Sequence, residues 1–475
     1  MVIRLADVGL CLQAAAISIV GVRLVSYYHS FLLHWRRYRH REEVSTADLK
    51  RLEVPYIRVH VTTRGQLGST EVILRGIRNV AALVAEDPAF YCGRITVEVC
   101  TESAQQAEFL ERYLSESAVA AAVVILLIPE RYRTPAGTLL KARSLHYVAE
   151  LRRAGWGRRP GRTFIVHYDE ESVIEPAELR KLLRCLALTD KKVLEGPIYY
   201  PLEYLSTSLL CRTMEANRPI GCFECRSVME RGVPLHLHGS NLVVEEQFEN
   251  EVGWDMGTLD GQPFIAEDYV FGVLAFLKGG RRAFGWHGTV MLEQPPFSYR
   301  SAFRQRQRWI TGVLQGQAML LRMAGYRQLT WAIRTQLIWG TRFRVFSFAV
   351  GAPVGLAFLG YVAMQLLGVV SAPWLGWAAT PLTLPLMGWI SLTGVMWLGS
   401  VFIGAWLNLA HAAISPLGRA TEIGKALTLA PVAGVLESSA GLWAVLRWLC
   451  GRREVSWQPT PKTKQADRQM DWSIG

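Results

Sequence analysis

The chain has 475 residues, of which half are hydrophobic and only 19% are charged, and its mean hydropathy is +0.16. This composition excludes a purely soluble protein and indicates membrane segments beside a large domain. The formal net charge is +12, but the arginines cluster beside apolar or aromatic runs, as at residues 36–41, which favours contact with anionic lipid headgroups over nucleic acid.

An apolar run near the start of the chain predicts a membrane anchor. Leu10 to Leu33 is long enough to span a bilayer, and the basic residues 36–41 follow directly. The positive-inside rule then places the chain from residue 36 onward in the cytosol. A cleaved signal peptide is the competing interpretation, but bulky and basic residues stand where a small-residue cleavage site would be required. We therefore expect residues 1–41 to form a retained transmembrane anchor with a basic flank.

Beyond Tyr56, short apolar runs alternate with amphipathic stretches. The apolar runs are residues 56–61, 95–100, 123–128 and 164–167, and helical periodicity is found at residues 71–84, 104–114 and 139–151. This alternation predicts an α/β domain with a mainly parallel, doubly wound sheet, which we assign to residues 50–296. Ligands of such sheets bind beyond the carboxyl ends of the strands. Polar segments stand there in this chain: Thr62–Gly65, Thr101–Ser103, Pro129–Tyr132 and Asp169–Glu171.

The second half of the chain is predicted to be helical and membrane-associated. Residues 199–214 and 297–321 are amphipathic and rich in aromatic side chains, as in helices that lie in the headgroup plane, and we assign residues 297–344 to interfacial helices. Between Val345 and Gly418 there is no Asp, Glu, Lys or Arg, which predicts two spans at residues 345–369 and 386–410.

The apolar stretch at residues 426–449 is harder to assign, because Pro431, Glu437 and Arg447 lie inside it. A full crossing would place the basic tail, residues 450–475, outside the cell, against the positive-inside bias. We therefore expect a re-entrant, interfacial or bundle-buried segment, in which Glu437 faces protein rather than lipid. Residues 345–449 as a whole are assigned to transmembrane or re-entrant helices, and 450–475 to a cytosolic tail.

The eight cysteines include one pair with a suggestive spacing, Cys222-x-x-Cys225. A structural zinc site would require a second pair, and a redox site would require a strand before the pair and a helix after it. Neither context is evident, so we interpret both residues as ordinary thiols in a reducing compartment.

Two sets of acids are candidates for catalysis. Asp169 and Glu171 follow the apolar strand at 164–167, and two carboxylates there suit Mg²⁺ or Mn²⁺ together with diphosphate oxygens; a solvated turn or helix cap is the alternative. Asp268, beside Glu267, is the candidate general base that accepts a proton from a hydroxyl group. The alternative is that both acids simply meet the dipole of a helix at residues 269–277.

Further candidates lie on one predicted helix face. Gln305, Arg308 and Trp309 are spaced i, i+3 and i+4, so Arg308 can bind a diphosphate, Gln305 can hydrogen-bond a sugar nucleotide or its acceptor, and Trp309 can support a sugar ring. A basic interfacial helix with a lipid-facing Trp explains the same pattern. Lys141 and Arg143 begin another predicted helix and either reach a phosphate or stay as exposed helix charges.

The turn His238-Gly239-Ser240-Asn241 offers backbone and amide groups to sugar hydroxyls, or is a plain tight turn. With this turn the order of motifs resembles the family 2 inverting glycosyltransferases, and within them the Egghead-type β-1,4-mannosyltransferases. The motifs are Thr62-Thr63-Arg64-Gly65, Glu98-Val99-Cys100-Thr101-Glu102, Pro129-x-x-Tyr132-x-Thr134-x-x-Gly137 with Lys141-Ala142-Arg143, His167-Tyr168-Asp169-Glu170-Glu171, His238-Gly239-Ser240-Asn241, Ala266-Glu267-Asp268 and Gln305-x-x-Arg308-Trp309. They cover residues 55–316.

The resemblance implies a cytosolic GT-A fold, a divalent metal at Asp169 and Glu171, a base at Asp268, GDP-mannose as donor and a glucosyl lipid as acceptor. We assign donor and diphosphate binding to Thr63, Arg64, Glu102, Lys141, Arg143, Asp169, Gln305 and Arg308, and acceptor binding to His238, Gly239, Ser240, Asn241 and Trp309. Glu102 and Glu171 depart from the family, which usually has Asp at both positions, so the donor is less firmly implied than the reaction.

These expectations describe a multi-pass enzyme of the cell membrane that adds one sugar to a lipid-linked acceptor. A processive polysaccharide synthase that uses a UDP-sugar, similar to cellulose or hyaluronan synthases, shares every motif, but the charge-free stretch at residues 345–418 offers few groups to line a polymer path. A catalytically silent membrane scaffold would predict damaged carboxylates, whereas Asp169, Glu171 and Asp268 are all present.

Overall fold

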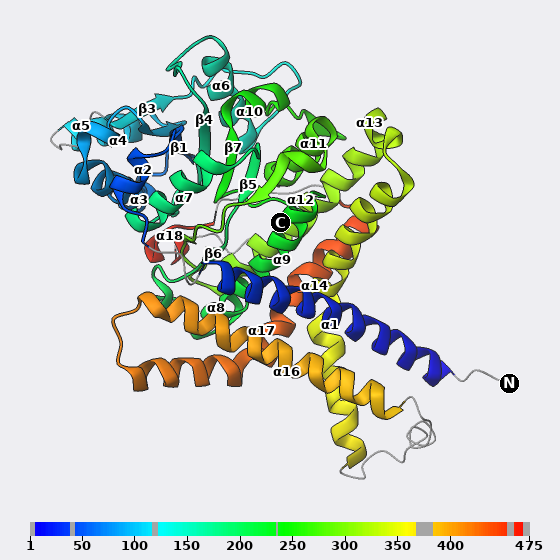
Figure 1. Ribbon diagram of the computed structural model, residues 1–475. Helices are drawn as coiled ribbons and strands as arrows, with labels where there is room; N and C mark the ends of the chain where they lie inside the picture. The colour runs from blue at the N-terminus through cyan, green and yellow to red at the C-terminus, as the bar shows by residue number, and fades with distance from the viewer. Residues whose placement is uncertain are drawn as a thin grey trace.

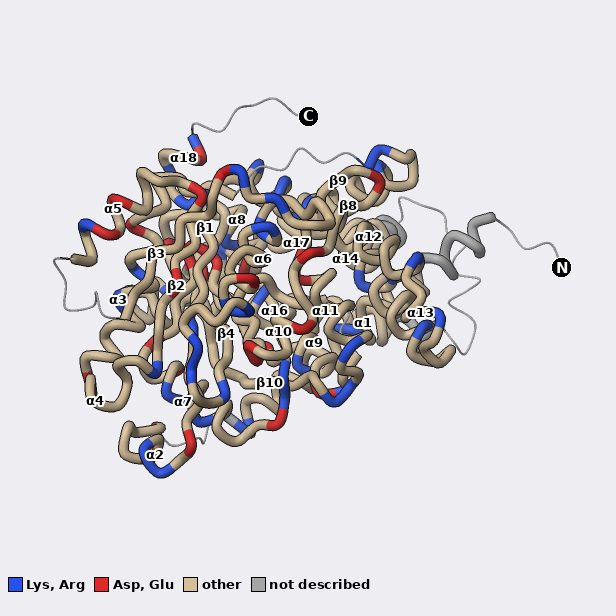
Figure 2. Tube along the Cα trace, turned by 90° about the horizontal axis from the view of Figure 1, so that it is seen from above, with Lys and Arg blue, Asp and Glu red and all other residues tan. Residues whose placement is uncertain are grey.

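The computed structural model describes residues 5–38, 43–115, 122–233, 236–366, 383–453 and 460–468. Figure 1 shows an α/β domain at one end of the molecule and long helices, among them α1 (Leu5–Tyr38), α16 (Thr383–Asn408) and α17 (Pro416–Leu449), at the other. In Figure 2 basic and acidic positions are interspersed over the α/β domain.

The α/β domain is built on a seven-stranded sheet with the order β10-β5-β7-β4-β1-β2-β3. Its strands are β1 (Tyr56–Thr63), β2 (Ile95–Thr101), β3 (Val123–Leu127), β4 (Thr163–Tyr168), β5 (Val193–Glu195), β7 (Leu242–Glu245) and β10 (Phe284–Trp286). All neighbouring pairs are parallel except those of β7, which runs antiparallel to β4 and β5. The predicted mainly parallel sheet is thus confirmed, and each predicted strand matches an observed one.

Alternation along β1 explains why helices cover both faces of the sheet. Ile57 and Val59 belong to an apolar core with α3 (Thr70–Glu86) and α7 (Pro176–Leu188). On the opposite face Arg58 pairs with Glu98 of β2 at 2.7 Å, beneath α6 (Leu140–Arg153) and α10 (Glu246–Val252). Side chains of successive strand residues point to opposite faces, so one strand serves both layers. Smaller helices and ladders complete the domain: α2 (Thr46–Lys50), α4 (Pro88–Tyr91), α5 (Ala104–Ser115), α11 (Glu267–Gly279), β6 (Ile198–Tyr199) with β11 (Met291–Leu292), and β8 (Thr258–Leu259) with β9 (Gln262–Pro263).

Three helices in the described part of the chain are long and apolar enough to cross a membrane, with candidate spans Ala14–Arg37, Gly388–His411 and Pro416–Leu449. The first two agree with the predicted anchor and with the predicted span at 386–410, and together they indicate membrane association. The predicted span at 345–369 lies largely in α14 (Trp331–Leu366) and ends outside the described residues. Because α14 is continuous from Trp331, the predicted boundary between residues 344 and 345 lies inside one helix.

One prediction about the helical part needs correction. Residues 199–214 do not form one helix: Tyr199 pairs in β6 with β11, Pro201 follows, and the helix α8 spans Leu209–Ala216.

Residues 426–449 belong to the unbroken helix α17, which packs against α12 (Tyr299–Arg322) and α14 and is itself long and apolar enough to cross a membrane. The assignment of this segment as re-entrant, interfacial or bundle-buried stays a prediction.

Glu437 of α17 faces protein, as predicted. Its carboxylate is 3.2 Å from Arg306 Nε of α12 and also pairs with Arg218, the first residue of α9 (Arg218–Arg231). Arg306 is fully buried and pairs in addition with Glu215. A partly buried carboxylate that keeps two guanidinium partners avoids the cost of an unpaired charge.

Candidate active site

Lys141 is the centre of a charge cluster at the carboxyl edge of the sheet. Its Nζ lies 2.6 Å from Oδ1 of Asp169, just beyond β4, 3.7 Å from Oε1 of Glu267 at the start of α11, and 3.1 Å from the carbonyl oxygen of Gly239. Four predicted site residues from four separate segments therefore meet at one ammonium group. Lys141 stands there because α6 begins at Leu140, whose positive φ of 59° ends the preceding loop.

Asp268 lies beside this cluster with an altered acidity. Burial, and then the neighbouring Glu267 carboxylate, raise the pKa of Asp268 from 3.8 to about 8, although Tyr269 N–H donates to its Oδ1 at 2.7 Å and Lys141 opposes the shift. A Cβ at Gly239 would lie 3.4 Å from both Asp268 Oδ2 and Lys141 Nζ, so the turn before β7 touches the acid directly. A carboxyl group with a pKa near neutrality is suited to proton transfer.

The predicted metal carboxylates are each held by an ammonium group. Asp169 binds Lys141, while Glu171 binds Lys462 from the C-terminal segment. Burial would raise the pKa of Asp169, but Lys141 and Lys462 together hold it below its ordinary value. Glu170, between the two, accepts instead from the Thr63 hydroxyl at the end of β1. The positions of Asp169 and Glu171 thus attract cations.

A second basic group lies at the ends of β1 and β2. The Glu102 carboxylate is 2.8 Å from Arg143 and 3.4 Å from Arg64, so these three predicted donor-site residues are brought together. Thr63 is buried at the end of β1 and its Oγ1 also accepts from Gly65 N–H at 3.0 Å. Two guanidinium groups that share one carboxylate leave a net positive charge at this edge.

Helix α12 brings Arg308 to the same cluster. Burial lowers the pKa of Arg308, and the carboxylates of Glu267, Asp169 and Glu171 oppose that shift, which places the guanidinium within their field. Arg308 also donates to the Thr460 hydroxyl at 3.0 Å. The helix comes this close because Gly312 and Gly316 face α11: a Cβ at these positions would collide with Ala266 and with Tyr269.

Gln305 and Trp309 point toward protein partners. The Gln305 side-chain oxygen accepts from Arg306. The Trp309 ring has two guanidinium groups in cation–π range, with ring-centroid distances of 4.8 Å to Arg218 and 5.0 Å to Arg306. These contacts attach the indole to the buried charges around Glu437. The stacking of a sugar on Trp309 stays a prediction.

The turn at His238–Asn241 is bound mainly to protein. Asn241 is fully buried, has a φ of 54°, and donates from Nδ2 to the carbonyl oxygens of Pro197 and Thr289, both at 2.9 Å. Ser240 is buried and donates to Glu293. Through these bonds the turn anchors the start of β7 to two loops. The Gly239 carbonyl accepts from Lys141, and the assignment of His238 and Gly239 to acceptor binding stays a prediction.

Two residues of the cluster were missed in the sequence. Glu293 directly follows β11, accepts from the Ser172 and Ser240 hydroxyls, and has a pKa raised to about 8 by burial and then by Glu171 and Asp169. Its place after a short apolar run was a usable signal. No sequence signal marked Lys462, because a lysine in a basic tail cannot be distinguished by sequence from a solvent-exposed lysine.

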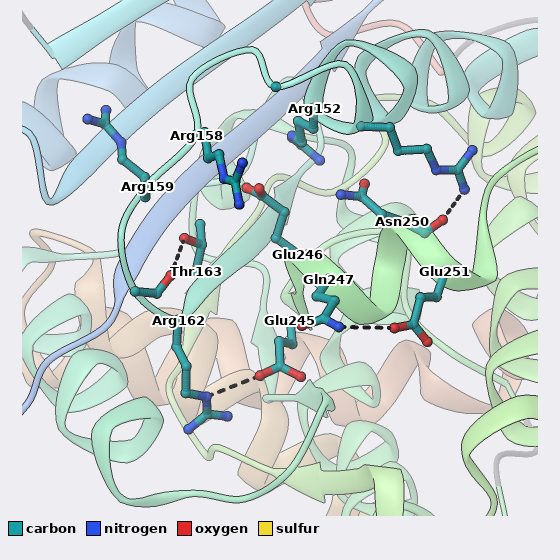
Figure 3. A pocket seen from close by; sticks show the side chains of 13 residues that line it. Arg152, Arg158, Arg159, Arg162, Thr163, Glu245, Glu246, Gln247, Asn250 and Glu251 are labelled. Atoms are coloured by element: carbon teal, nitrogen blue, oxygen red, sulfur yellow. Dashed lines mark hydrogen bonds and ion pairs between the residues drawn. The ribbon is translucent and has the colours of Figure 1, made fainter.

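A cavity of about 730 Å³ lies elsewhere, near the amino end of β4, and contains none of the predicted site residues. Figure 3 shows its arginines and acids around Thr163, with Arg162 paired to Glu245. Arg152 at its inner wall is held by Glu98 and Glu249 at 2.6 and 2.9 Å. Arg162 and Glu245 pair across the cavity, whereas Glu246 pairs with Arg58 of β1, so several of its charges are held by the strands of the sheet.

The chain is similar to known glycosyltransferases. The family described as glycosyl transferase family group 2 matches residues 164–407. The curated β-1,4-mannosyltransferase egh of Drosophila melanogaster is 27% identical over 196 residues, and the β-1,4-mannosyltransferase bre-3 of Caenorhabditis elegans is 26% identical over 198 residues. Each alignment covers 40% of this chain and 40% of the relative, so the chain spans about two fifths of the length of the curated relatives it matches.

Solved structures with a similar chain trace include the mannosyltransferase PcManGT from Pyrobaculum calidifontis in complex with GDP-Man and Mn²⁺, at a TM-score of 0.44 and 15% identity over 84% of this chain and 99% of that one. TarS 1–349 of S. aureus in complex with UDP-GlcNAc has a TM-score of 0.33 and 12% identity over 84% of this chain and 92% of that one. At these TM-scores neither structure identifies a substrate. The family match, in contrast, covers just over half of the chain and includes Asp169, Asp268 and Arg308, and on this ground the chain belongs to glycosyl transferase family group 2.

Proposed function

We propose that this protein is a membrane-associated inverting glycosyltransferase that transfers mannose from GDP-mannose to the sugar of a lipid-linked acceptor, forming a β-1,4 linkage. The observation that carries the proposal is the meeting of Asp169, Glu267 and Gly239 at Lys141, directly beside an Asp268 whose pKa is about 8. The similarity to β-1,4-mannosyltransferases supports the choice of sugar and linkage.

In this proposal Asp268 removes the proton from the acceptor hydroxyl while the nucleoside diphosphate leaves from the opposite face of the donor sugar. A single displacement of this kind requires one base and inverts the anomeric centre. Gly239 has no side chain, and a Cβ there would lie 3.4 Å from both Asp268 Oδ2 and Lys141 Nζ. Arg308 and the pair Arg64 and Arg143 supply guanidinium groups for the diphosphate, a ligand that such planar donors bind well.

Asp169 and Glu171 suit a divalent cation. Their carboxylate oxygens are hard ligands of the kind that Mg²⁺ and Mn²⁺ prefer, and each holds an ammonium group. When bound, the metal would neutralise negative charge on the leaving diphosphate.

A lipid-linked acceptor fits the place of the site beside the helical bundle. Arg308 lies on α12, which packs against α17, a helix long and apolar enough to cross a membrane. A headgroup sugar at the membrane surface would therefore reach the edge of the sheet without leaving its lipid.

The deciding experiment is a donor screen. Full-length protein in detergent is incubated with GDP-mannose and, separately, with UDP-sugars, together with glucosyl lipids, and products are analysed by mass spectrometry. We expect one mannose added per acceptor from GDP-mannose. Transfer from UDP-sugars alone would refute the mannosyl proposal, and long polymers would establish a processive synthase in its place.

The rate of transfer should increase with pH. A general base acts only when deprotonated, and the folded-state pKa of Asp268 is about 8. Because the Lys141 ammonium lowers that pKa, Lys141→Gln should move the rising limb of kcat/KM to higher pH. The measurement is kcat/KM from about pH 6 to about pH 9 in both proteins. A limb that stays in place, or moves to lower pH, would contradict the assignment.

A further inference from the structure

One cluster of ligand-type side chains lies outside the proposed catalytic machinery. Cys225 of α9 is buried, and its Sγ is 3.4 Å from Nε2 of His236 and 3.4 Å from Nε2 of His238, both in the loop before β7. The three ligand atoms all lie within 4.8 Å of one another. Cys222, three residues earlier, points elsewhere and donates to the Ile198 carbonyl at 3.7 Å. The Cys-x-x-Cys pair is therefore not a chelate, but its second member has two imidazole partners.

The two separations from the sulfur atom are those of zinc ligands. Bonds of about 2.3 Å to sulfur and about 2.0 Å to nitrogen, at a tetrahedral angle, separate the two ligand atoms by roughly 3.6 Å. Both observed separations from Cys225 Sγ are 3.4 Å, so a cation fits with small shifts of the side chains. Thiolate and imidazole together favour Zn²⁺ over the hard cations proposed for Asp169.

The protonation states of the two histidines also suit a metal. Burial lowers the pKa of His238 to about 3, and burial and then Arg344 lower that of His236 well below its ordinary value, so both rings are neutral and carry a lone pair. Burial raises the pKa of the Cys225 thiol well above its ordinary value, so a cation must displace that proton to bind the sulfur. Nδ1 of His238 is buried without a hydrogen-bond partner among the described residues, and a cation on the same ring would offset part of that cost.

Arg344 of α14 competes for the site. Its guanidinium contacts both ring nitrogens of His236, at 2.7 Å for Nε2, and its Nε is 3.3 Å from the Glu224 carboxylate. A cation must displace the guanidinium from His236 Nε2, and Glu224 then keeps Arg344 paired. The guanidinium therefore weakens the site without abolishing it.

We propose that Cys225, His236 and His238 bind Zn²⁺ in a three-ligand site that fixes α9 to the turn at Gly239. His238 is the neighbour of Gly239, whose carbonyl accepts from Lys141 at 3.1 Å, so the zinc site positions the turn that separates Lys141 from Asp268. A fourth coordination position is left for water. Zn²⁺ binding requires neither the proposed donor nor the acceptor, although His238 is also one of the residues predicted to bind the acceptor.

The test uses full-length protein in detergent, purified with a tag that lacks histidine and freed of metal by a chelator. Titration with Zn²⁺ against a chromophoric chelator should give one equivalent per chain, and Co²⁺ should give a thiolate charge-transfer band. Cys225→Ser should remove that band and weaken Zn²⁺ binding by at least about 100-fold. Zn²⁺ should also raise the melting temperature of wild-type protein but not of Cys225→Ser.

Matched variants keep the test decisive. Cys222→Ser should bind Zn²⁺ like wild type, because its thiol faces Ile198, and Asp169→Asn should do so because its carboxylate belongs to the other site. Arg344→Gln should bind Zn²⁺ more tightly, since the competing guanidinium is gone, and this holds even if Cys225→Ser does not fold. The proposal is overturned if wild type takes up no stoichiometric Zn²⁺, if Cys225→Ser binds it unchanged, or if Arg344→Gln binds it no better than wild type.

Discussion

Replacing Asp268 by Asn should lower the rate of sugar transfer by roughly 10²- to 10⁴-fold, the usual contribution of a general base. The amide has nearly the same shape as the carboxyl group but accepts no proton at any accessible pH. Nucleotide binding should be nearly unchanged, because Arg308 and the Arg64–Arg143 pair are intact. The measurement is single-turnover transfer with saturating donor, together with nucleotide affinity by calorimetry.

The same substitution should not destabilise the fold. The pKa of Asp268 is raised in the folded protein from 3.8 to about 8, so the folded state binds more protons than the unfolded one between these values. The stability contributed by this group is present below pH 3.8 and is lost as pH rises toward 8. Asn titrates nowhere in that window, so the variant should melt at or above the wild-type temperature at pH 8.

The control for Asp268→Asn is Asp190→Asn, an exposed acid whose side chain is 86% accessible. It should leave transfer and melting unchanged. Loss of activity in Asp268→Asn together with an unchanged or raised melting temperature separates a chemical role from a structural one. Wild-type turnover by Asp268→Asn would refute the base assignment.

Removal of the divalent cation should be nearly as damaging. Chelation, or Asp169→Asn combined with Glu171→Gln, should reduce transfer by roughly 100-fold or more, because a metal on a leaving diphosphate stabilises the transition state by several kcal/mol and each about 1.4 kcal/mol is a tenfold change in rate. The chelated wild-type enzyme should recover with Mn²⁺ or Mg²⁺. The double variant should not recover at any metal concentration that restores the wild type.

Transfer activity of the chelated enzyme should recover without Zn²⁺ at Asp169 and Glu171. Their carboxylate oxygens are hard ligands, which suit Mg²⁺ or Mn²⁺. Glu108→Gln, an exposed acid on α5, is the matched control and should respond to chelation as the wild type does. Full activity in the presence of chelator would contradict the proposal of a divalent cation at Asp169 and Glu171. The ammonium groups of Lys141 and Lys462 would then be sufficient to neutralise the leaving diphosphate.

The sheet could be predicted from sequence because β1, β2 and β4 are largely buried and, like the partly buried β3, read as apolar runs. β5, β7 and β10 were missed, since strands of three or four residues leave no periodicity. The segment at residues 199–214 was mistaken for a helix because its aromatic side chains have helical spacing, whereas Pro201 and the pairing of Tyr199 with β11 decide the outcome. A local sequence pattern cannot predict that two strands of two residues each will pair when they lie far apart in the chain.

The site was predictable where chemistry follows a strand or begins a helix. Asp169, Lys141 and Asp268 all stand at such places, and the structure brings them together. What sequence could not provide are partners far apart in the chain, such as Lys462 on Glu171 or Arg218 beside Trp309. The roles of Asn241 and Gln305 also depend on such partners, because an amide that could bind a sugar is bonded to protein instead.

Gly312 and Gly316 have a consequence beyond close packing. They let α12 lie against the start of α11. A Cβ atom at either position would collide with α11 or its N-cap residue and would push Arg308 away from Asp268. The other side of α12 lies against α17. If α17 spans a bilayer, a change in its tilt would thus act on Asp268 through one helix, with no loop between them. The candidate site is therefore coupled through α12 to a helix that is long and apolar enough to cross a membrane.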